Sequence, residues 1–173
     1  DYSGLGLSTG TPSYGKADMA HDVNDLVEAL ELGKVIIGGW SLRGVAAQVW
    51  SLGHRNILGL RFDAQGRLWD LEHGPRGGDE LNLVERGRNY GWPLVSEGRH
   101  YDGRSIPPHS SRPELAAPAI GWDPVIAPGD FVFYRGSLFP EWRGQALIAA
   151  LGAQGIVRVA IEGTKAREVA RYD

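Results

Sequence analysis

The sequence contains no cysteine and only one methionine, Met19, in 173 residues. The lack of cysteine excludes disulfides, cysteine-ligated metal sites and thiol nucleophiles, but it leaves the cellular compartment open, because a periplasmic protein can do without disulfides. No apolar run approaches the roughly 18 residues that span a bilayer. The chain starts at Asp1 with neither a basic nor an apolar leader, so we expect a fragment that lacks its initiator and any signal peptide.

The sequence also lacks a strong excess of charge of one sign. It has 18 Lys and Arg residues against 21 Asp and Glu residues, for a formal net charge of −3. This balance does not indicate nucleic acid as a partner. Glycine, by contrast, is abundant, with 25 residues, about twice the usual share of roughly 7%. Such a composition favours a turn-rich protein over a helical bundle.

The composition changes near residue 50, which predicts two domains. Of ten prolines, only Pro12 lies before residue 70, and of six tryptophans only Trp40 lies before residue 50. Within residues 1–49, a segment with helical spacing of apolar residues precedes the β-branched run 35–39, and a second helical segment follows. Helix, strand, tight turn and helix is an α/β pattern. We therefore predict a short α/β domain over residues 1–49 and a different domain over residues 50–173.

The second domain contains short apolar segments that are bounded by turn residues. Several short strands at this spacing are typical of an all-β sandwich, barrel or propeller. Residues 97–130 are proline-rich and lack periodicity, so we predict a long surface excursion there. The predicted strands are Leu58–Phe62, Leu68–Leu71, Leu81–Val84, Phe131–Tyr134, Ala146–Leu151, Val157–Ile161 and Glu168–Tyr172.

Ser41 lies where a strand turns sharply into a helix, as the serine of a nucleophile elbow does. The motif is imperfect because Arg43 stands where the Gly-x-Ser-x-Gly pattern has glycine. A serine that caps the helix is the alternative. Together with the Asp-x-x-Gly-x-Gly-x-Ser loop at residues 1–8, the segment 1–49 resembles the middle of an α/β hydrolase. A triad also needs an acid and a histidine later in the chain, and no later α/β unit is predicted to hold them.

The segment 72–82 is the densest polar cluster of the chain. Its carboxylates and the free carbonyls beside Gly and Pro are hard oxygen ligands, which suit Ca²⁺ better than zinc. A solvated turn is the alternative. Upstream, Arg55 stands beside the amide of Asn56, a pair suited to carboxylate or quinone oxygens. An arginine in a surface turn is the commoner case.

Together with three further motifs, at residues 89–93, 101–103 and 139–144, these two segments resemble the soluble aldose sugar dehydrogenases that depend on pyrroloquinoline quinone (PQQ), the glucose/sorbosone dehydrogenase family. The resemblance runs from about residue 49 to the end of the chain. It implies a six-bladed β-propeller that oxidises the anomeric carbon of aldoses with PQQ and Ca²⁺, usually in the periplasm. At about 40 to 45 residues per blade, residues 50–173 would form about three blades of a mainly β, partial propeller. Its open edges could pair with a second copy of the chain.

The resemblance also implies individual roles for residues of this chain. The family has Pro-Gln after the Arg-Asn pair and often has a lysine in its last cofactor loop, and this chain departs from both patterns. The residues that would contact the quinone are Arg55, Asn56, Tyr101, Ala150, Leu151 and Gly152. The residues that would hold Ca²⁺ are Gly74 and Pro75, through their carbonyls, and Glu80 and Tyr90.

Three functional hypotheses remain open at this point. The first is an oxidoreductase of the PQQ and Ca²⁺ type that is incomplete, because the family's general base, a histidine on an earlier blade, has no counterpart here. The second is an α/β serine hydrolase with Ser41 as its nucleophile, and the third is an inactive chimeric fragment. The first predicts an aldose sugar as substrate and leaves the electron acceptor undefined.

Overall fold

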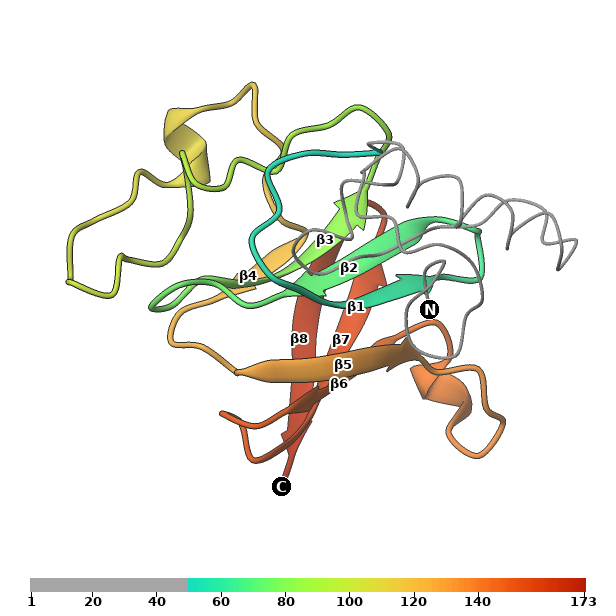
Figure 1. Ribbon diagram of the computed structural model, residues 1–173. Coiled ribbons are helices and arrows are strands. Elements are labelled where there is room, and N and C mark those ends of the chain that lie inside the picture. Colours follow the sequence, from blue (N-terminus) through green and yellow to red (C-terminus); the bar gives the residue numbers. More distant parts are fainter. Residues whose placement is uncertain (1–49) are drawn as a thin grey trace, which may run out of the picture. The chain divides into compact units, whose positions relative to one another are not determined.

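The computed structural model describes residues 50–173, which form two antiparallel four-stranded sheets (Figure 1). In both sheets the strand order follows the chain order, so that each sheet is a meander. Within residues 50–173, no helix is long and apolar enough to cross a membrane. The first sheet contains β1 (Ile57–Phe62), β2 (Leu68–Glu72), β3 (Asp79–Val84) and β4 (Ile120–Trp122), and the second contains β5 (Pro128–Phe133), β6 (Ala146–Ala150), β7 (Gly155–Glu162) and β8 (Lys165–Tyr172). Residues 50–173 also contain two short 3₁₀ turns, η2 (His109–Ser111) and η3 (Pro140–Trp142).

All seven predicted strands are present, with ends shifted by a few residues, and the mainly β class is confirmed. The sequence missed β4, whose three residues are too few to show a period of two. The excursion at 97–130 is only partly on the surface, because Leu115 and Ile126 are buried. Residues 50–173 contain two sheets instead of about three blades, since the long connection between β3 and β4 forms no sheet of its own. The predicted α/β domain and Ser41 lie outside the described residues.

The main core lies between the two sheets. Gly59 in β1 allows their close approach, because a Cβ there would lie 2.9 Å from the ring of Phe131 in β5. The rings of Phe131 and Phe133 meet edge to face at 5.5 Å, a geometry that aromatic pairs favour. The largest fully buried apolar residues of this core are Trp69, Leu71 and Leu81 from the first sheet and Phe131, Ile148, Val157 and Val159 from the second, with Ile126 from the connection between the sheets.

The other face of the first sheet is covered by the excursion between β3 and β4. Tyr90 and Ala116 of this excursion pack on Leu68 and Val84. Successive side chains of a strand point to opposite faces, so β2 directs Trp69 and Leu71 into the main core, and Leu68, Asp70 and Glu72 to the opposite side. All five residues of β2 are buried. This strand therefore carries the core on one face and a buried acidic cluster on the other.

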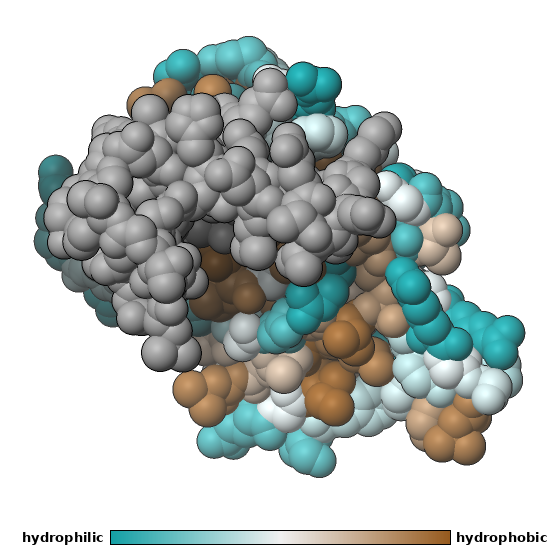
Figure 2. Space-filling model, turned by 45° about the vertical axis from the view of Figure 1, so that its right-hand side comes forward, coloured by the Kyte–Doolittle hydropathy of each residue, from teal (hydrophilic) through white to brown (hydrophobic). Residues whose placement is uncertain are grey.

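Apolar side chains also remain exposed at the surface, interspersed with polar ones (Figure 2). In the second sheet, Val132, Ile156 and Tyr172 are 51%, 45% and 38% exposed. Val132 and Ile156 alternate along their strands with residues of the main core, and Tyr172 pairs with Ile156, so all three lie on the sheet face that points away from the first sheet.

Replacing Phe131 tests the packing between the sheets. We expect Phe131→Ala to lower the free energy of unfolding by about 3 to 5 kcal/mol, because it leaves a cavity in the main core. Val132→Ala is the matched control, since the neighbouring side chain is half exposed, and it should cost less than about 1 kcal/mol. Urea denaturation followed by circular dichroism measures both, and equal losses would contradict the sheet packing.

Candidate functional site

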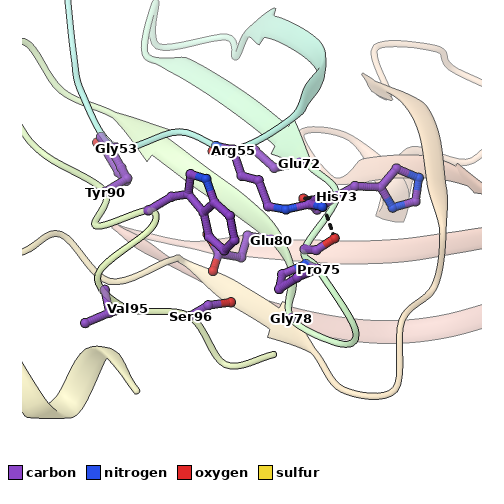
Figure 3. A pocket seen from close by; sticks show the side chains of 12 residues that line it. Gly53, Arg55, Glu72, His73, Pro75, Gly78, Glu80, Tyr90, Val95 and Ser96 are labelled. Carbon is purple, nitrogen blue, oxygen red and sulfur yellow. Dashed lines mark hydrogen bonds between the residues drawn. The ribbon is translucent and has the colours of Figure 1, made fainter. Parts of the chain in front are cut away.

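A polar pocket lies at the end of β2 and the start of β3 (Figure 3). It is formed by the segment before β1, the loop from β2 to β3 and the loop that follows β3. Five of the residues that the sequence assigned to the quinone or to Ca²⁺ line it together, namely Arg55, Gly74, Pro75, Glu80 and Tyr90. Asn56, Tyr101 and the segment 150–152 do not line this pocket.

Arg55 is fixed by main-chain carbonyls and by aromatic rings. Its Nη1 donates to the carbonyl oxygens of His73 and Gly74, at 2.9 and 2.7 Å, and its Nη2 donates to the hydroxyl of Tyr101 at 3.0 Å. The guanidinium also lies 5.2 Å from the centre of the Trp92 ring, within the range of a cation–π interaction. The pocket thus holds a permanent, oriented cation.

Glu72, the last residue of β2, fixes the backbone that carries Arg55. Its Oε2 accepts from the main-chain N–H groups of Arg55 and Asn56, at 2.6 and 3.2 Å. Its Oε1 lies 2.7 Å from Nδ1 of His54 and accepts from Nδ2 of Asn82 at 3.1 Å. Because a buried carboxylate must be hydrogen-bonded, the position of Glu72 dictates the local path of residues 54–56.

His54 lies between two acids, with its Nδ1 2.7 Å from Oε1 of Glu72 and 2.9 Å from Oδ2 of Asp70. Its ring stacks on that of Tyr90 at 4.7 Å. Burial lowers the pKa of His54, but the hydrogen bonds and charges of Asp70 and Glu72 outweigh it and raise this pKa to about 10. His54 is therefore an imidazolium at neutral pH.

The same atoms also resemble a Ser–His–acid triad and a metal site. Nε2 of His54 lies 2.8 Å from Oγ of Ser51, as in a Ser–His–acid triad, but an imidazolium cannot take the proton of a serine. Three ligand atoms of His54, Asp70 and Glu72 lie close enough to one another to surround a metal ion. Two of these atoms, Nδ1 of His54 and Oε1 of Glu72, are 2.7 Å apart, which is a hydrogen-bond distance.

Glu80 faces Glu72 across the β2–β3 pair. Burial and the negative charges of Glu72, Asp70 and Glu97 raise the pKa of Glu80 to about 8, although a hydrogen bond with Asn82 opposes the shift. A carboxyl group in this setting would gain more from a divalent cation than an exposed one. The carbonyl oxygen of Tyr90, the other predicted ligand beside it, lies 3.1 Å from Nε2 of His109.

The predicted quinone loop at residues 150–152 is anchored to the connection between the sheets. The main-chain N–H of Leu151 donates to the carbonyl of Ala127 at 2.9 Å, and that of Gly152 donates to the carbonyl of Ile126 at 2.8 Å. The side chain of Leu151 is 83% exposed. This loop belongs to the second sheet, whereas the residues of the pocket belong to the first sheet and its connections.

Two stacked four-stranded meanders, with a polar pocket at one end of a sheet, define a portion of a β-propeller. The chain belongs to the glucose/sorbosone dehydrogenase family, because the sequence model described as Glucose / Sorbosone dehydrogenase matches residues 39–172. This match includes residue 41 and overlaps the segment that resembles a hydrolase by eleven residues, 39–49. Nothing in the comparisons supports a hydrolase region.

The chain is similar to aldose sugar dehydrogenases of two bacteria. The chain is 37% identical over 133 residues to the aldose sugar dehydrogenase YliI of Escherichia coli. The matched region covers 74% of this chain and 35% of that protein. The chain superposes with a TM-score of 0.64 and 36% identity on the apo-form of the soluble aldose sugar dehydrogenase of Escherichia coli, over 74% of this chain and 38% of that one. It also superposes on the PQQ-bound form of aldose sugar dehydrogenase from Streptomyces coelicolor, with a TM-score of 0.50 and 27% identity, over 71% of this chain and 33% of that one. The chain thus spans about a third of the length of these relatives.

Sequence analysis missed the polar residues that support the pocket. It gave no role to His54, Asp70 or Trp92, and it treated the carboxylates of segment 72–82 as free ligands. The sequence signal that could have identified the acids is the alternation in β2, where acidic residues at every second position are flanked by large apolar ones. A strand that is buried on both faces and still carries two acids must satisfy them internally.

The charge of His54 should make the free energy of unfolding depend on pH. Because its pKa is raised in the folded state, its contribution to stability is complete below about pH 6.5, the ordinary pKa of histidine, and is lost as the pH rises towards about 10. We expect the free energy of unfolding of the wild type to fall relative to that of His54→Gln between these values. Urea titrations at pH 6.5, 8 and 9.5 measure the difference. A difference that is constant with pH would show that His54 is neutral when folded.

Proposed function

We propose that residues 50–173 are the part of a PQQ- and Ca²⁺-dependent aldose sugar dehydrogenase that holds the quinone and its metal ion. The enzyme would oxidise the anomeric carbon of an aldose in the periplasm and pass the electrons to an acceptor. The observation that carries this proposal is the fixed position of Arg55 in a pocket that also contains the carbonyl of Gly74 and the carboxyl group of Glu80.

The donor and acceptor groups around the pocket have the chemistry that suits both ligands. Main-chain carbonyls and carboxylates are the ligands that Ca²⁺ prefers, and Gly74 and Glu80 offer one of each. A guanidinium is a flat, forked donor that suits carboxylate and quinone oxygens, and the ring of Trp92 beside it suits a flat aromatic ligand. Gly74 is also a position that only glycine can occupy, since a Cβ would lie 2.2 Å from the carbonyl oxygens of Gly77 and Gly78.

Each predicted residue has a proposed task. Gly74 and Pro75 would hold the Ca²⁺ ion of the cofactor through their carbonyl oxygens, and Glu80 and Tyr90 would hold a structural Ca²⁺ ion. PQQ, when bound, supplies the two-electron oxidant. The residues that would contact it are Arg55, Asn56, Tyr101, Ala150, Leu151 and Gly152.

The reaction also needs a general base that accepts a proton from the sugar. The family's general base comes from an earlier blade. In the described part of the chain, His73 is the histidine that lines the pocket, and its Nδ1 lies 3.3 Å from the buried carboxylate of Asp79. We therefore expect this chain to bind the cofactor without turning over sugar by itself.

Titration with PQQ in the presence of Ca²⁺, followed by the quinone absorbance, tests the proposal. We expect the wild type to bind, Arg55→Ala to raise the Kd at least tenfold, and Arg55→Lys to fall between them, because lysine keeps the charge without the fork. Arg112→Ala is the control, since Arg112 is exposed and pairs only with Glu114 among the described residues. Glucose and a dye acceptor are then added, and reduction of the dye would reveal a proton acceptor outside the pocket.

Binding by Arg55→Ala that equals binding by the wild type would overturn the role of Arg55. An unchanged quinone spectrum with the wild type would overturn the proposed function as a whole.

Removal of Ca²⁺ gives a second test that needs no quinone. We expect millimolar CaCl₂ to raise the Tm of the wild type above its value in EDTA, because an ion that binds only the folded state stabilises it by about 2.7 kcal/mol at a hundredfold excess over Kd. Glu80→Gln should lose most of this rise. Glu85→Gln should keep it, because Glu85 is an exposed residue just after β3. Equal rises in all three proteins would exclude Glu80 as a ligand.

A further inference from the structure

Asp79, the first residue of β3, is fully buried and joins two separate parts of the chain. Its Oδ1 accepts from the main-chain N–H of Gly74 at 3.0 Å. Its Oδ2 accepts from the main-chain N–H groups of Ile126 and Ala127, both at 2.9 Å. The first contact lies in the loop that follows β2, and the other two lie just before β5. Both oxygens of the carboxylate are thus engaged in hydrogen bonds.

The hydrogen bonds of Asp79 extend through peptide planes to both predicted cofactor loops. A peptide group is planar, so fixing the N–H of Gly74 also fixes the carbonyl of His73, which accepts from Arg55. In the same way, fixing the N–H of Ala127 fixes the carbonyl of Ile126, which accepts from the N–H of Gly152. One carboxylate therefore orients two carbonyl groups. One of them accepts from Arg55, and the other accepts from the loop 150–152.

We infer that Asp79 is a positioning residue that couples the Ca²⁺ loop at Gly74 and Pro75 to the quinone loop at residues 150–152. The inference rests on the proposed function for the identity of the ligands, but the hydrogen-bond path itself does not. Ordering of one loop by its ligand lowers the cost of ordering the other, so Ca²⁺ and PQQ should each raise the affinity of the other by the same factor.

Asp79→Asn tests this path. The substitution keeps the shape of the side chain, but it replaces one acceptor oxygen by an NH₂ donor. This NH₂ group would face a main-chain N–H donor, so the side chain can no longer accept from both loops. Asp63→Asn is a matched control. Asp63 is also buried and accepts from main-chain N–H groups, those of Gln65 and Arg67, but it lies in the turn between β1 and β2 outside the pocket.

Hydrogen exchange of the ligand-free proteins is the first measurement. We expect Asp79→Asn to speed the exchange of the Leu151 and Gly152 amides at least tenfold, although the substitution lies in the other sheet. Asp63→Asn should leave these amides unchanged. Unchanged exchange at Leu151 and Gly152 in Asp79→Asn would overturn the coupling whether or not the chain binds PQQ, so this result is separate from a failure of the proposed function.

Affinities are the second measurement, with PQQ titrated at low and high Ca²⁺. We expect the factor by which Ca²⁺ raises the PQQ affinity to be smaller in Asp79→Asn than in the wild type and to stay at the wild-type value in Asp63→Asn. Equal factors in the two variants would contradict the inference.

Gly152→Ala keeps the inference testable if Asp79→Asn does not fold. A Cβ at residue 152 would lie 2.8 Å from the carbonyl oxygen of Ile126. It would therefore disturb the same hydrogen-bond path at the Ile126 carbonyl and leave the carboxylate of Asp79 in place. We expect faster exchange of the Gly74 amide in this variant. An unchanged Gly74 amide would contradict the coupling.

Discussion

A buried carboxylate is stable only where donors surround it, and this requirement organises the pocket. Glu72 and Asp79 lie at facing ends of two paired strands, and each uses both oxygens on main-chain N–H groups or fixed side chains. The main-chain donors come from loops that have no regular structure of their own. Each loop therefore takes its path from the acid that it satisfies, and the sheets provide rigid positions for these acids.

The strand β2 explains how packing and chemistry coexist in so small a sheet. Trp69 and Leu71 enter the core between the sheets, while Asp70 and Glu72 point to the opposite side. Rigid packing on the first face holds the acids on the second in place, and a functional group supported by packed neighbours is more precisely oriented than one on a free loop. The polar face is closed by the excursion between β3 and β4, which supplies Tyr90 as the stacking partner of His54.

The charges of the pocket are unevenly balanced. Asp70 and Glu72 share the imidazolium of His54, whereas Glu80 forms no ion pair within residues 50–173 and its pKa is raised to about 8. Arg55 directs its charge towards carbonyl groups and aromatic rings. Glu80 and Arg55 are thus the two groups whose charges a cation and an anionic ligand would complement, and they are the groups that the family resemblance assigns to Ca²⁺ and PQQ.

The sequence alone determined the seven longer strands, because alternation and turn residues are local signals, and its motifs located Arg55, Gly74 and Glu80. It did not reveal β4, whose three residues form a strand only by pairing with β3. It also could not assign Asp79 or His54, since Ile126 is 47 residues away from Asp79 and the charge of His54 depends on two acids 16 and 18 residues away. Tertiary structure decided these roles, because hydrogen bonds and pKa shifts depend on distances between groups that only folding brings together.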